Sequence, residues 1–196
     1  MSAGRRARDP LDRYDTDPRD TARFLDRLVP HLGTVPIEVV LEPAAGAGNM
    51  LPPLRAAFPH ARLLARDVEP RGEGICRADF LDPRARGGPD GGGRFDPDPD
   101  LIFTNPPFRL AEQFLTRAME VVAEGGFVVL LLRAAFLESR KRSNLLERYP
   151  PTDVWFCTTR PRFTGPNAAG GTDSAMYAWF LWEKGTRQTY FRGYVL

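Results

Sequence analysis

The amino-acid sequence predicts an α/β fold: a doubly wound, mostly parallel seven-stranded sheet with helices on both faces and an antiparallel edge strand. Two observations lead to this prediction. Short apolar runs alternate along the chain with stretches of helical length, and a turn rich in small residues follows the first of those runs. The 196 residues are enough for one well-buried domain and too few for two ordinary ones, so we expect a single domain over residues 1–196.

Seven apolar runs have the length and composition of strands. They cover residues 39–41, 62–65, 75–78, 101–104, 127–132, 154–158 and 178–182. Helices are predicted over residues 21–32, with Asp20 as the N-cap, and over 50–58, 110–123 and 134–149. Because helical stretches follow the first, fourth and fifth strands, we expect parallel crossovers there. No helical pattern joins the last two strands, so we expect them to pair antiparallel, as a hairpin at the sheet edge.

The bulk composition narrows the class of protein. No apolar run approaches the roughly 20 residues of a membrane helix, and the Arg-rich residues 1–12 lack the apolar stretch of a secretory signal, so we expect a cytoplasmic protein. The net charge of +2 permits a polyanionic partner but does not demand one. Cys76 and Cys157 are too few for a disulfide framework, and we expect both to be reduced core residues. Residues 83–100, crowded with Gly, Pro and Asp, are predicted to form a flexible surface loop.

The first strand runs directly into Glu-Pro-Ala-Ala-Gly-Ala-Gly-Asn at residues 42–49. Small residues let the backbone turn sharply here and approach a ligand closely at the carboxyl end of a central strand. A dinucleotide-binding fingerprint would need a third glycine where Leu51 stands, and a phosphate-binding P-loop would need Gly-Lys-Ser or Gly-Lys-Thr, which the sequence lacks. Glu42 at the mouth of the turn would repel phosphates, but it would suit a cationic sulfonium compound that bears an ammonium group.

Polar and aromatic side chains follow the next two strands. Asp67 stands at the end of the second strand, where acidic side chains hydrogen-bond ribose hydroxyls. Asp79 and Phe80 follow the third strand, and they offer an acceptor for an exocyclic amine and an aromatic face for a purine. Each of these residues alone could be an ordinary surface acid or core aromatic. Their occurrence at successive strand ends indicates a nucleoside ligand.

The most specific motif is Asn105-Pro106-Pro107-Phe108, which follows the fourth strand directly. The prolines fix the backbone and remove its N–H donors, so nearby carbonyl groups are free to accept hydrogen bonds from a ligand. Asn105 adds a side-chain acceptor, and Phe108 adds an aromatic plane. This set suits a planar group that carries an NH2, such as N6 of adenine or a carboxamide nitrogen.

Over nearly the whole chain, these motifs resemble those of class I S-adenosylmethionine-dependent methyltransferases of the N6-adenine DNA methyltransferase group, especially the small single-domain, phage-type enzymes with a Rossmann-like fold. The resemblance implies S-adenosylmethionine as the cofactor, DNA as the partner and no metal. It assigns catalysis to the Asn-Pro-Pro-Phe motif. The cofactor-binding residues that it implies are Thr16, Glu42, Pro43, Ala44, Gly46, Gly48, Asp67, Asp79, Phe80 and Asn105. Thr16 lies in Tyr14-Asp15-Thr16, which resembles the family's N-terminal motif except that Asp17 interrupts the expected Thr-Pro.

The resemblance also implies a mechanism. The Asn105 side chain and the Pro106 carbonyl would accept hydrogen bonds from the amine, whose lone pair is otherwise delocalised into the ring, and the amine would attack the sulfonium methyl in line. In duplex DNA the base would have to leave the stack. Phe163 stands after the sixth strand, where related enzymes hold an aromatic residue against the flipped base. The loop at 165–174 beyond it could order on substrate binding.

A basic group near the predicted substrate face could hold the phosphates of a nucleic acid, although a solvated helix face is the more ordinary interpretation of such a group. It consists of Arg133, Arg140, Lys141 and Arg142.

Three other functions remain open from the sequence. A protein glutamine N5-methyltransferase would hold a carboxamide nitrogen on Asn105 in much the same way, although Asn-Pro-Pro-Tyr is usual there and Phe108 favours adenine. An RNA adenine methyltransferase would use the same tetrapeptide, because that motif reads the base and not the sugar. A non-catalytic nucleic-acid-binding protein would have no need of Asn105, Glu42 and Gly48, all of which are intact.

Overall fold

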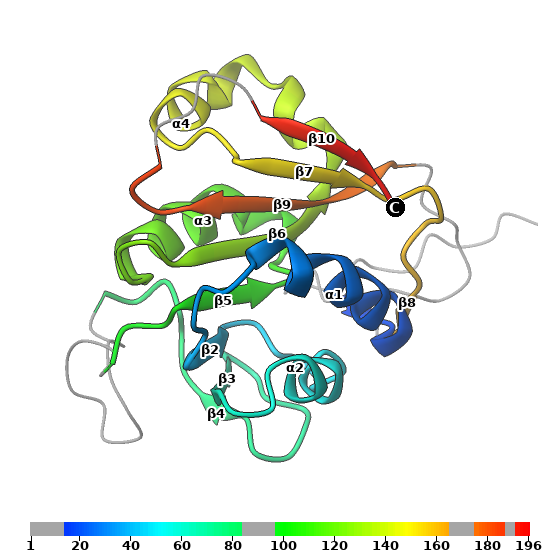
Figure 1. Ribbon diagram of the computed structural model, residues 1–196, viewed down its shortest axis with the longest axis vertical. Helices are drawn as coiled ribbons and strands as arrows, with labels where there is room; N and C mark the ends of the chain where they lie inside the picture. Colours follow the sequence, from blue (N-terminus) through cyan, green and yellow to red (C-terminus); the bar gives the residue numbers. More distant parts are fainter. Residues whose placement is uncertain (1–13, 84–96, 165–174, 187–190) are drawn as a thin grey trace, which may run out of the picture.

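From a computed structural model of the protein, we describe residues 14–83, 97–164, 175–186 and 191–196. An eight-stranded sheet forms the centre, and helices cover both of its faces (Figure 1). The order across the sheet is β10 (Arg192–Val195), β7 (Asp153–Phe156), β9 (Tyr177–Glu183), β6 (Phe127–Arg133), β5 (Leu101–Thr104), β2 (Val39–Glu42), β3 (Arg62–Asp67) and β4 (Cys76–Arg77). A separate two-stranded sheet pairs β1 (Asp15–Thr16) with β8 (Phe163–Thr164).

The predicted α/β class and the mostly parallel sheet are confirmed. Strands β4, β3, β2, β5 and β6 run parallel to one another in this order, whereas β9 runs antiparallel to both β6 and β7. The expected antiparallel pairing of the last two predicted strands is therefore present. Its position differs from the prediction, because β9 lies between β7 and β6 and is not outermost. The sheet also has an eighth strand, β10, which continues it beyond β7 in parallel.

Two core layers explain why the central strands are almost continuously apolar. In β6, the side chains of Val128, Leu130 and Leu132 belong to the layer beneath α3 (Ala111–Val121) and α4 (Ser143–Arg148). The alternate residues of the strand face the opposite layer, beneath α1 (Pro18–Leu32) and α2 (Leu51–Ala57). A strand buried on both faces needs apolar side chains at every position, which is the pattern that the sequence has there.

Helix α1 begins earlier than predicted, and its cap is a different residue. Asp17 is the N-cap: its Oδ1 accepts a hydrogen bond from the Arg19 N–H at 2.9 Å, and Pro18 occupies the first helical turn. Asp20, the predicted cap, lies inside the helix. Its Oδ2 accepts a hydrogen bond from the Arg162 backbone N–H at 2.7 Å, which ties the helix to the segment before β8. The prediction of Asp20 as the cap was wrong because helical spacing alone did not reveal the turn before Thr21.

The predicted helix over residues 134–149 is broken into three short pieces. Two 3-10 turns, η2 (Ala134–Glu138) and η3 (Arg140–Arg142), come before α4. Ser139 between them has an extended backbone, with φ −96° and ψ 119°, so the α-helical hydrogen-bond ladder cannot pass through it. The helix predicted over 110–123 is present as α3, preceded by the 3-10 turn η1 (Phe108–Leu110).

The two cysteines and the predicted 83–100 loop agree with the prediction only in part. Cys76 is exposed on the short outer strand β4, so its assignment to the core was wrong, whereas Cys157 is half-buried and burial raises its pKa to about 12. Most of the predicted 83–100 loop lies outside the described residues. Its last residue, Asp100, is fixed, because its Oδ2 accepts hydrogen bonds from the N–H groups of Glu38 and Val39 at 2.8 Å each.

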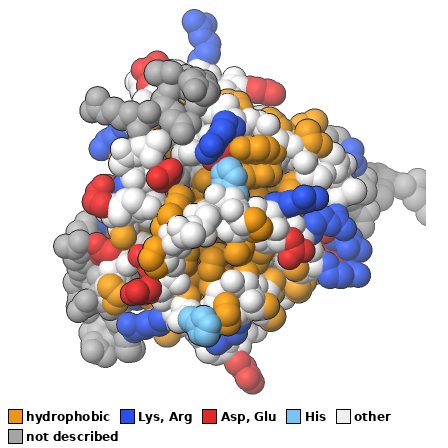
Figure 2. Space-filling view, in the orientation of Figure 1, with side chains coloured by type: hydrophobic (Ala, Val, Ile, Leu, Met, Phe, Trp, Pro, Cys, Tyr) orange, Lys and Arg blue, Asp and Glu red, His pale blue; other side chains and the backbone are white. Residues whose placement is uncertain are grey.

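The surface of the described residues has two further features. None of their helices combines the length and apolar character needed to span a membrane. In the orientation of Figure 1, hydrophobic side chains gather over the face that carries α1 and α2, and Lys and Arg side chains gather on its right-hand side (Figure 2). A shallow apolar groove between the two helices includes Leu25, Val29 and Pro53.

Candidate active site

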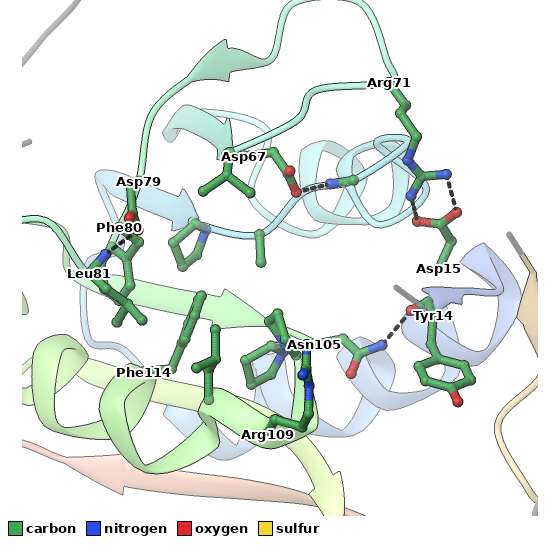
Figure 3. Close-up of a pocket in the computed structure, with 17 residues that line it drawn as sticks. Tyr14, Asp15, Asp67, Arg71, Asp79, Phe80, Leu81, Asn105, Arg109 and Phe114 are labelled. Atoms are coloured by element: carbon green, nitrogen blue, oxygen red, sulfur yellow. Dashed lines mark hydrogen bonds and ion pairs between the residues drawn. The ribbon is translucent and has the colours of Figure 1, made fainter. Parts of the chain in front are cut away.

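A cavity opens at the carboxyl ends of β2, β3 and β5, where open α/β sheets bind their ligands (Figure 3). Its lining comes from strand ends and the turns after them, together with the N-terminal segment before α1. The lining residues are Tyr14, Asp15, Pro43, Ala44, Gly46, Asp67, Val68, Arg71, Asp79, Phe80, Leu81, Asn105, Pro106, Pro107, Arg109, Leu110 and Phe114. The sequence-predicted residues of the glycine turn, the two acidic strand ends and the Asn-Pro-Pro motif thus meet at one cavity.

The turn after β2 forms one wall, and Gly46 is the residue on which its shape depends. Gly46 has φ +55°, a conformation that residues with a side chain rarely adopt. A Cβ atom there would also stand 2.6 Å from Asp15 Oδ1 and 2.9 Å from Arg71 Nη2. The Gly46 N–H donates to Asp67 Oδ2 at 2.8 Å, which joins the turn to the end of β3. Glycine at this position therefore keeps a close approach open between three segments.

The acidic strand ends face the same cavity. Asp67 Oδ1 accepts a hydrogen bond from the Glu69 N–H at 2.8 Å, and Asp79 Oδ1 accepts one from the Leu81 N–H at 2.9 Å. Backbone N–H groups bond to both oxygens of Asp67 and to one oxygen of Asp79, and they hold each carboxylate in a defined orientation. Phe80 is buried beside Phe114, with ring centroids 5.3 Å apart, and both rings form the apolar end of the cavity. This end is suited to a flat aromatic group with an exocyclic amine.

Glu42 lies elsewhere than predicted. It is fully buried behind the turn and does not line the cavity; its Oε1 accepts a hydrogen bond from the Ala44 N–H at 2.9 Å, and its Oε2 has no hydrogen-bond partner among the described residues. Burial raises the pKa of this carboxyl to about 8, against the opposing effects of the Thr104 hydroxyl and the Ala44 N–H. At neutral pH the side chain is therefore mostly an uncharged acid.

Two more predicted cofactor residues stand behind the lining. Gly48 has φ +84° and shapes the second half of the turn without reaching the cavity. Thr16 is buried in β1, and its hydroxyl accepts a hydrogen bond from Asn105 Nδ2 at 3.0 Å. Thr16 therefore contacts Asn105 of the motif and not the cavity itself. Tyr14 and Asp15, from the same segment, do line the cavity.

Asn105 has its amide group divided between two tasks. Its Nδ2 donates to the Tyr14 carbonyl at 2.7 Å and to Thr16 Oγ1 at 3.0 Å, so both N–H bonds of the amide are used. Its Oδ1 is buried and has no hydrogen-bond partner among the described residues. Figure 3 shows the NH2 turned toward Tyr14 and the oxygen turned away from it. A buried acceptor without a partner is costly, and a ligand that donates a hydrogen bond would relieve that cost.

Four aromatic rings gather next to the motif. Phe108 lies outside the lining of the cavity, and its ring centroid is 5.6 Å from Tyr14, 5.6 Å from Tyr177 and 6.4 Å from Phe163. The Phe163 ring is 5.7 Å from Tyr14 and 5.1 Å from Tyr177. The Arg133 guanidinium lies 5.3 Å from the centre of the Phe108 ring, within cation–π range. Phe108 and Phe163, predicted from distant parts of the sequence, are therefore brought together.

Solved structures of methyltransferases share this architecture. A protein from Pyrococcus horikoshii, assigned as an RNA methyltransferase, has a TM-score of 0.60 and 17% identity over 89% of this chain and 87% of its own. A protein from Listeria monocytogenes, assigned as a class I S-adenosylmethionine-dependent methyltransferase, has a TM-score of 0.58 and 13% identity over 99% of this chain and 68% of its own. The chain has the fold of these methyltransferases.

A third similar structure comes from a restriction system. It is a modification subunit of an enzyme assigned as a type I restriction enzyme, from Vibrio vulnificus, with a TM-score of 0.58 and 16% identity over 92% of this chain and 45% of its own. No protein-family model matches the chain, and no curated protein matches it. Within the methyltransferase fold, the assignment of individual site residues therefore depends on the geometry of this chain.

The four basic residues predicted to bind phosphate differ in their surroundings. Arg142 is committed to internal contacts: its Nε donates to Glu112 Oε1 at 2.9 Å, and its guanidinium lies 4.9 Å from the Phe136 ring. Its prediction as a phosphate-binding residue is thus at odds with a structural role that joins η3 to α3. Arg140 and Lys141 are exposed in η3, which follows the strand after the Asn-Pro-Pro-Phe motif. Arg133, at the end of β6, is the basic residue in contact with the aromatic rings.

Sequence reasoning missed three charged residues of the cavity lining, Asp15, Arg71 and Arg109. Asp15 comes from β1 and Arg71 from the turn after β3, and these two form an ion pair with Nη2 to Oδ1 at 2.6 Å. No motif includes Arg71, and a lone Arg after a strand is common on protein surfaces. The only signal in the sequence was the position of both residues next to segments that had already been assigned to the cofactor.

Proposed function

We propose that the chain is an S-adenosylmethionine-dependent methyltransferase that acts on N6 of adenine in nucleic acid, and that DNA is the preferred polymer. The observation that carries the proposal is the state of Asn105. Its oxygen is a buried acceptor without a partner among the described residues, at the end of β5 and next to Pro106 on the cavity wall. Its NH2 is held by the Tyr14 carbonyl and by Thr16 Oγ1, and exchanging the oxygen with the nitrogen would lose the bond to Tyr14, because two carbonyl oxygens would then face each other.

An acceptor in this position supports chemistry at an amine. The exocyclic nitrogen of adenine is a poor nucleophile because its lone pair is delocalised into the ring. Hydrogen bonds from its N–H groups to Asn105 Oδ1 and to the Pro106 carbonyl would concentrate electron density on nitrogen as it attacks. The contact is strongest in the transition state, where positive charge develops on the amine, and it therefore lowers the barrier.

The rest of the cavity supports the proposed cofactor. Phe80 and Asp79 would hold the adenine of S-adenosylmethionine, and Asp67 would bind its ribose. Gly46 and Ala44 would lie against the sulfur-containing methionine part. Gly46 leaves room beside the turn for the Asp15 carboxylate and the Arg71 guanidinium, which place two charged groups next to this part of the cavity. S-adenosylmethionine supplies the electrophilic methyl group when it is bound. The residues of the cavity would bind and orient the cofactor and exclude water, so they contribute to the reaction by positioning.

The aromatic rings beside Asn105 support a planar target. Tyr14 and Phe163 lie beside Phe108 of the motif. A base outside its stack gains about 1 to 3 kcal/mol from stacking on such a ring. That gain offsets the few kcal/mol of extracting a base from a duplex. A nucleic-acid target is also consistent with the relatives that are assigned as an RNA methyltransferase and as a restriction modification subunit.

Transfer of a labelled methyl group tests the proposal against its rivals. Purified protein and labelled S-adenosylmethionine would be offered duplex DNA, single-stranded DNA, RNA and a protein extract in parallel. We expect label in DNA, released as N6-methyladenine on digestion, and none in the same DNA with purine in place of adenine. Label in RNA alone would assign the activity to RNA adenine, and label in glutamine would assign it to protein. Cofactor binding with no transfer to any fraction would support a non-catalytic binding protein.

A further inference from the structure

The Asp15–Arg71 ion pair is a charged feature of the cavity that methyl transfer to adenine does not explain. Arg71 donates from Nη2 to Asp15 Oδ1 at 2.6 Å and from Nη1 to Oδ2 at 2.9 Å, so the two planar groups meet in a fork. Both residues line the cavity. In Figure 3 they stand at the end opposite Asp79 and Phe80, with Asp67 between.

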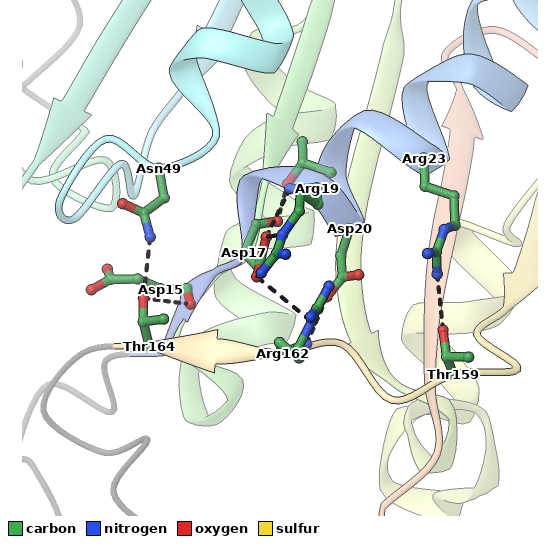
Figure 4. Close-up of polar contacts among 10 residues, drawn as sticks. Asp15, Asp17, Arg19, Asp20, Arg23, Asn49, Thr159, Arg162 and Thr164 are labelled. Carbon is green, nitrogen blue, oxygen red and sulfur yellow. Dashed lines mark hydrogen bonds and ion pairs between the residues drawn. The ribbon is translucent and has the colours of Figure 1, made fainter.

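The backbone on both sides holds the pair at this place. Asp15 lies in β1, opposite Thr164 of β8, and the Thr164 hydroxyl donates to the Asp15 carbonyl at 3.4 Å (Figure 4). The Arg71 N–H donates to the Gly46 carbonyl at 2.9 Å. The absence of a side chain on Gly46 is what lets both charged groups rest against the turn. The pair is therefore anchored from two segments and is partly shielded, with 9% of the Asp15 side chain and 27% of the Arg71 side chain exposed.

A carboxylate and a guanidinium side by side are complementary to a zwitterion. The protein carboxylate can bind the ammonium group of a ligand. The guanidinium can bind the carboxylate of the same ligand through two parallel hydrogen bonds, a geometry that lysine cannot reproduce. A free α-amino acid group carries both charges on one carbon. Along the cavity, an aromatic and amine-accepting end is followed by Asp67, then by the Gly46 turn and then by this pair. That order matches the order of adenine, ribose and amino-acid chain in S-adenosylmethionine.

We propose that Asp15 and Arg71 form the receptor for the amino-acid end of the cofactor, with Asp15 binding its ammonium group and Arg71 its carboxylate. This inference rests on the proposed function, because it takes S-adenosylmethionine as the ligand. Binding exchanges one ion pair for two, and the amino-acid zwitterion itself adds no net charge to this part of the site. Without ligand the residues neutralise each other, so the site avoids an isolated charge in a shielded place.

Calorimetry with matched ligands tests the receptor without any dependence on catalysis. S-adenosylhomocysteine carries the whole zwitterion, and 5′-methylthioadenosine lacks it. We expect the wild-type protein to bind the first about 10- to 100-fold more tightly than the second, as for hydrogen bonds to charged groups. Arg71→Ala and Asp15→Asn should each reduce that ratio to below about one third of the wild-type value. Affinity for 5′-methylthioadenosine should stay within about twofold, which also reports that each variant has folded.

A second ligand pair assigns the two charges separately. Decarboxylated S-adenosylmethionine keeps the amine and lacks the carboxylate, so the preference for S-adenosylmethionine over it should depend on Arg71 and should survive in Asp15→Asn. Arg162→Ala is the matched control, because it removes an exposed arginine 3.6 Å from Asp17 beside the same small sheet, outside the cavity lining (Figure 4). That variant should keep wild-type ratios.

The outcomes distinguish a failure of the receptor from a failure of the proposed function. If the wild-type protein binds S-adenosylhomocysteine and 5′-methylthioadenosine equally, or if Arg71→Ala keeps the wild-type ratios, the receptor is overturned and the proposed function stands. If the wild-type protein binds none of the ligands, the proposed function is overturned and this inference with it. If Arg162→Ala lowers the ratio as much as Arg71→Ala does, the effect belongs to the small sheet and the receptor is again overturned.

Discussion

At the scale of single residues, Asn105 connects the N-terminal segment to the reaction. Its NH2 binds Tyr14 and Thr16, and its buried oxygen remains for the target amine. We expect Asn105→Ala to lower the rate of methyl transfer at least about a hundredfold, because an electrostatic contact to the reacting group is commonly worth about 3 kcal/mol of barrier. Binding of S-adenosylmethionine, measured by calorimetry, should survive.

The matched control for this variant is Thr16→Val. It removes one of the two groups that hold the Asn105 NH2 and leaves the acceptor oxygen in place. We expect a loss of rate much smaller than in Asn105→Ala. An Asn105→Ala protein that methylates adenine at nearly the wild-type rate, or that no longer binds cofactor, would contradict the division between cofactor site and target site.

Glu42 predicts a pH dependence of stability. Burial raises its pKa to about 8 in the folded protein, from an ordinary value of 4.5. A raised pKa means that the fold binds the proton more tightly than the unfolded chain does, so this stabilisation is complete below pH 4.5 and is lost as the pH rises toward 8. The free energy of unfolding should therefore fall with pH across this window, by up to about 1.4 kcal/mol per pH unit from this group.

Urea unfolding of wild type and Glu42→Gln at several pH values from 4 to about 9 measures this contribution. It gives the slope of the free energy of unfolding against pH for each protein. Glutamine has the shape of the uncharged acid, so the variant should lack this part of the slope. The stability difference between the two proteins should move in favour of the variant as the pH rises. Parallel curves for both proteins would show that Glu42 is ionised, or equally hydrated, in the folded state.

At the scale of elements, η3 carries the two exposed basic residues that remain free to bind phosphate. Arg140 and Lys141 are exposed, whereas Arg142 binds Glu112. We expect the double variant Arg140→Ala with Lys141→Ala to bind DNA more weakly and with a shallower dependence on salt, by roughly one unit of slope for each phosphate that the variant no longer neutralises. Fluorescence anisotropy over a salt series measures the slope. Arg55→Ala, an exposed arginine on α2, is the control; equal slopes in all three proteins would remove η3 from the interface.

The elements that the sequence predicted well are those whose burial leaves a clear run of apolar residues. Strands β5, β6 and β9 are buried on both faces, and each is apolar at every residue except its last. Strand β10 escaped prediction because it is held by polar contacts: Arg192 donates to the fully buried Asp153 from Nε at 2.6 Å and from Nη2 at 3.0 Å. Such a strand has no apolar run by which to recognise it.

The site was predictable where its residues end a strand and not where the fold brings segments together. Asp67 ends β3, Asn105 follows β5 directly and Asp79 stands just after β4, so the parallel topology alone places them at one edge of the sheet. The Asp15–Arg71 contact depends on how the N-terminal segment packs against a turn 56 residues away. Glu42 also follows the strand pattern, yet the tight turn after it covers its side chain, an effect that spacing does not reveal.

At the scale of the whole molecule, cofactor binding should stabilise the fold. A ligand that binds only the folded chain adds about 2.7 kcal/mol to the free energy of unfolding at a concentration 100 times its Kd. We expect the thermal midpoint to rise progressively with S-adenosylmethionine and S-adenosylhomocysteine and to stay constant with methionine alone, which lacks the adenosine part. A midpoint that is unchanged by all three compounds would mean that the cavity does not bind this cofactor.

The small β1–β8 sheet has a consequence for how the protein is made. Thr164 bonds to the Asp15 carbonyl across 149 residues and to Asn49 across 115, and Tyr14 bonds to Asn105 across 91. Contacts between such distant residues form late in folding, because the intervening chain must first be ordered. A ribosome that has translated only as far as β7 has released every residue of the Asn-Pro-Pro-Phe motif but not the strand that pairs with β1. We therefore expect nascent chains to remain inactive until β8 has emerged, together with β9, which follows it and lies between β7 and β6.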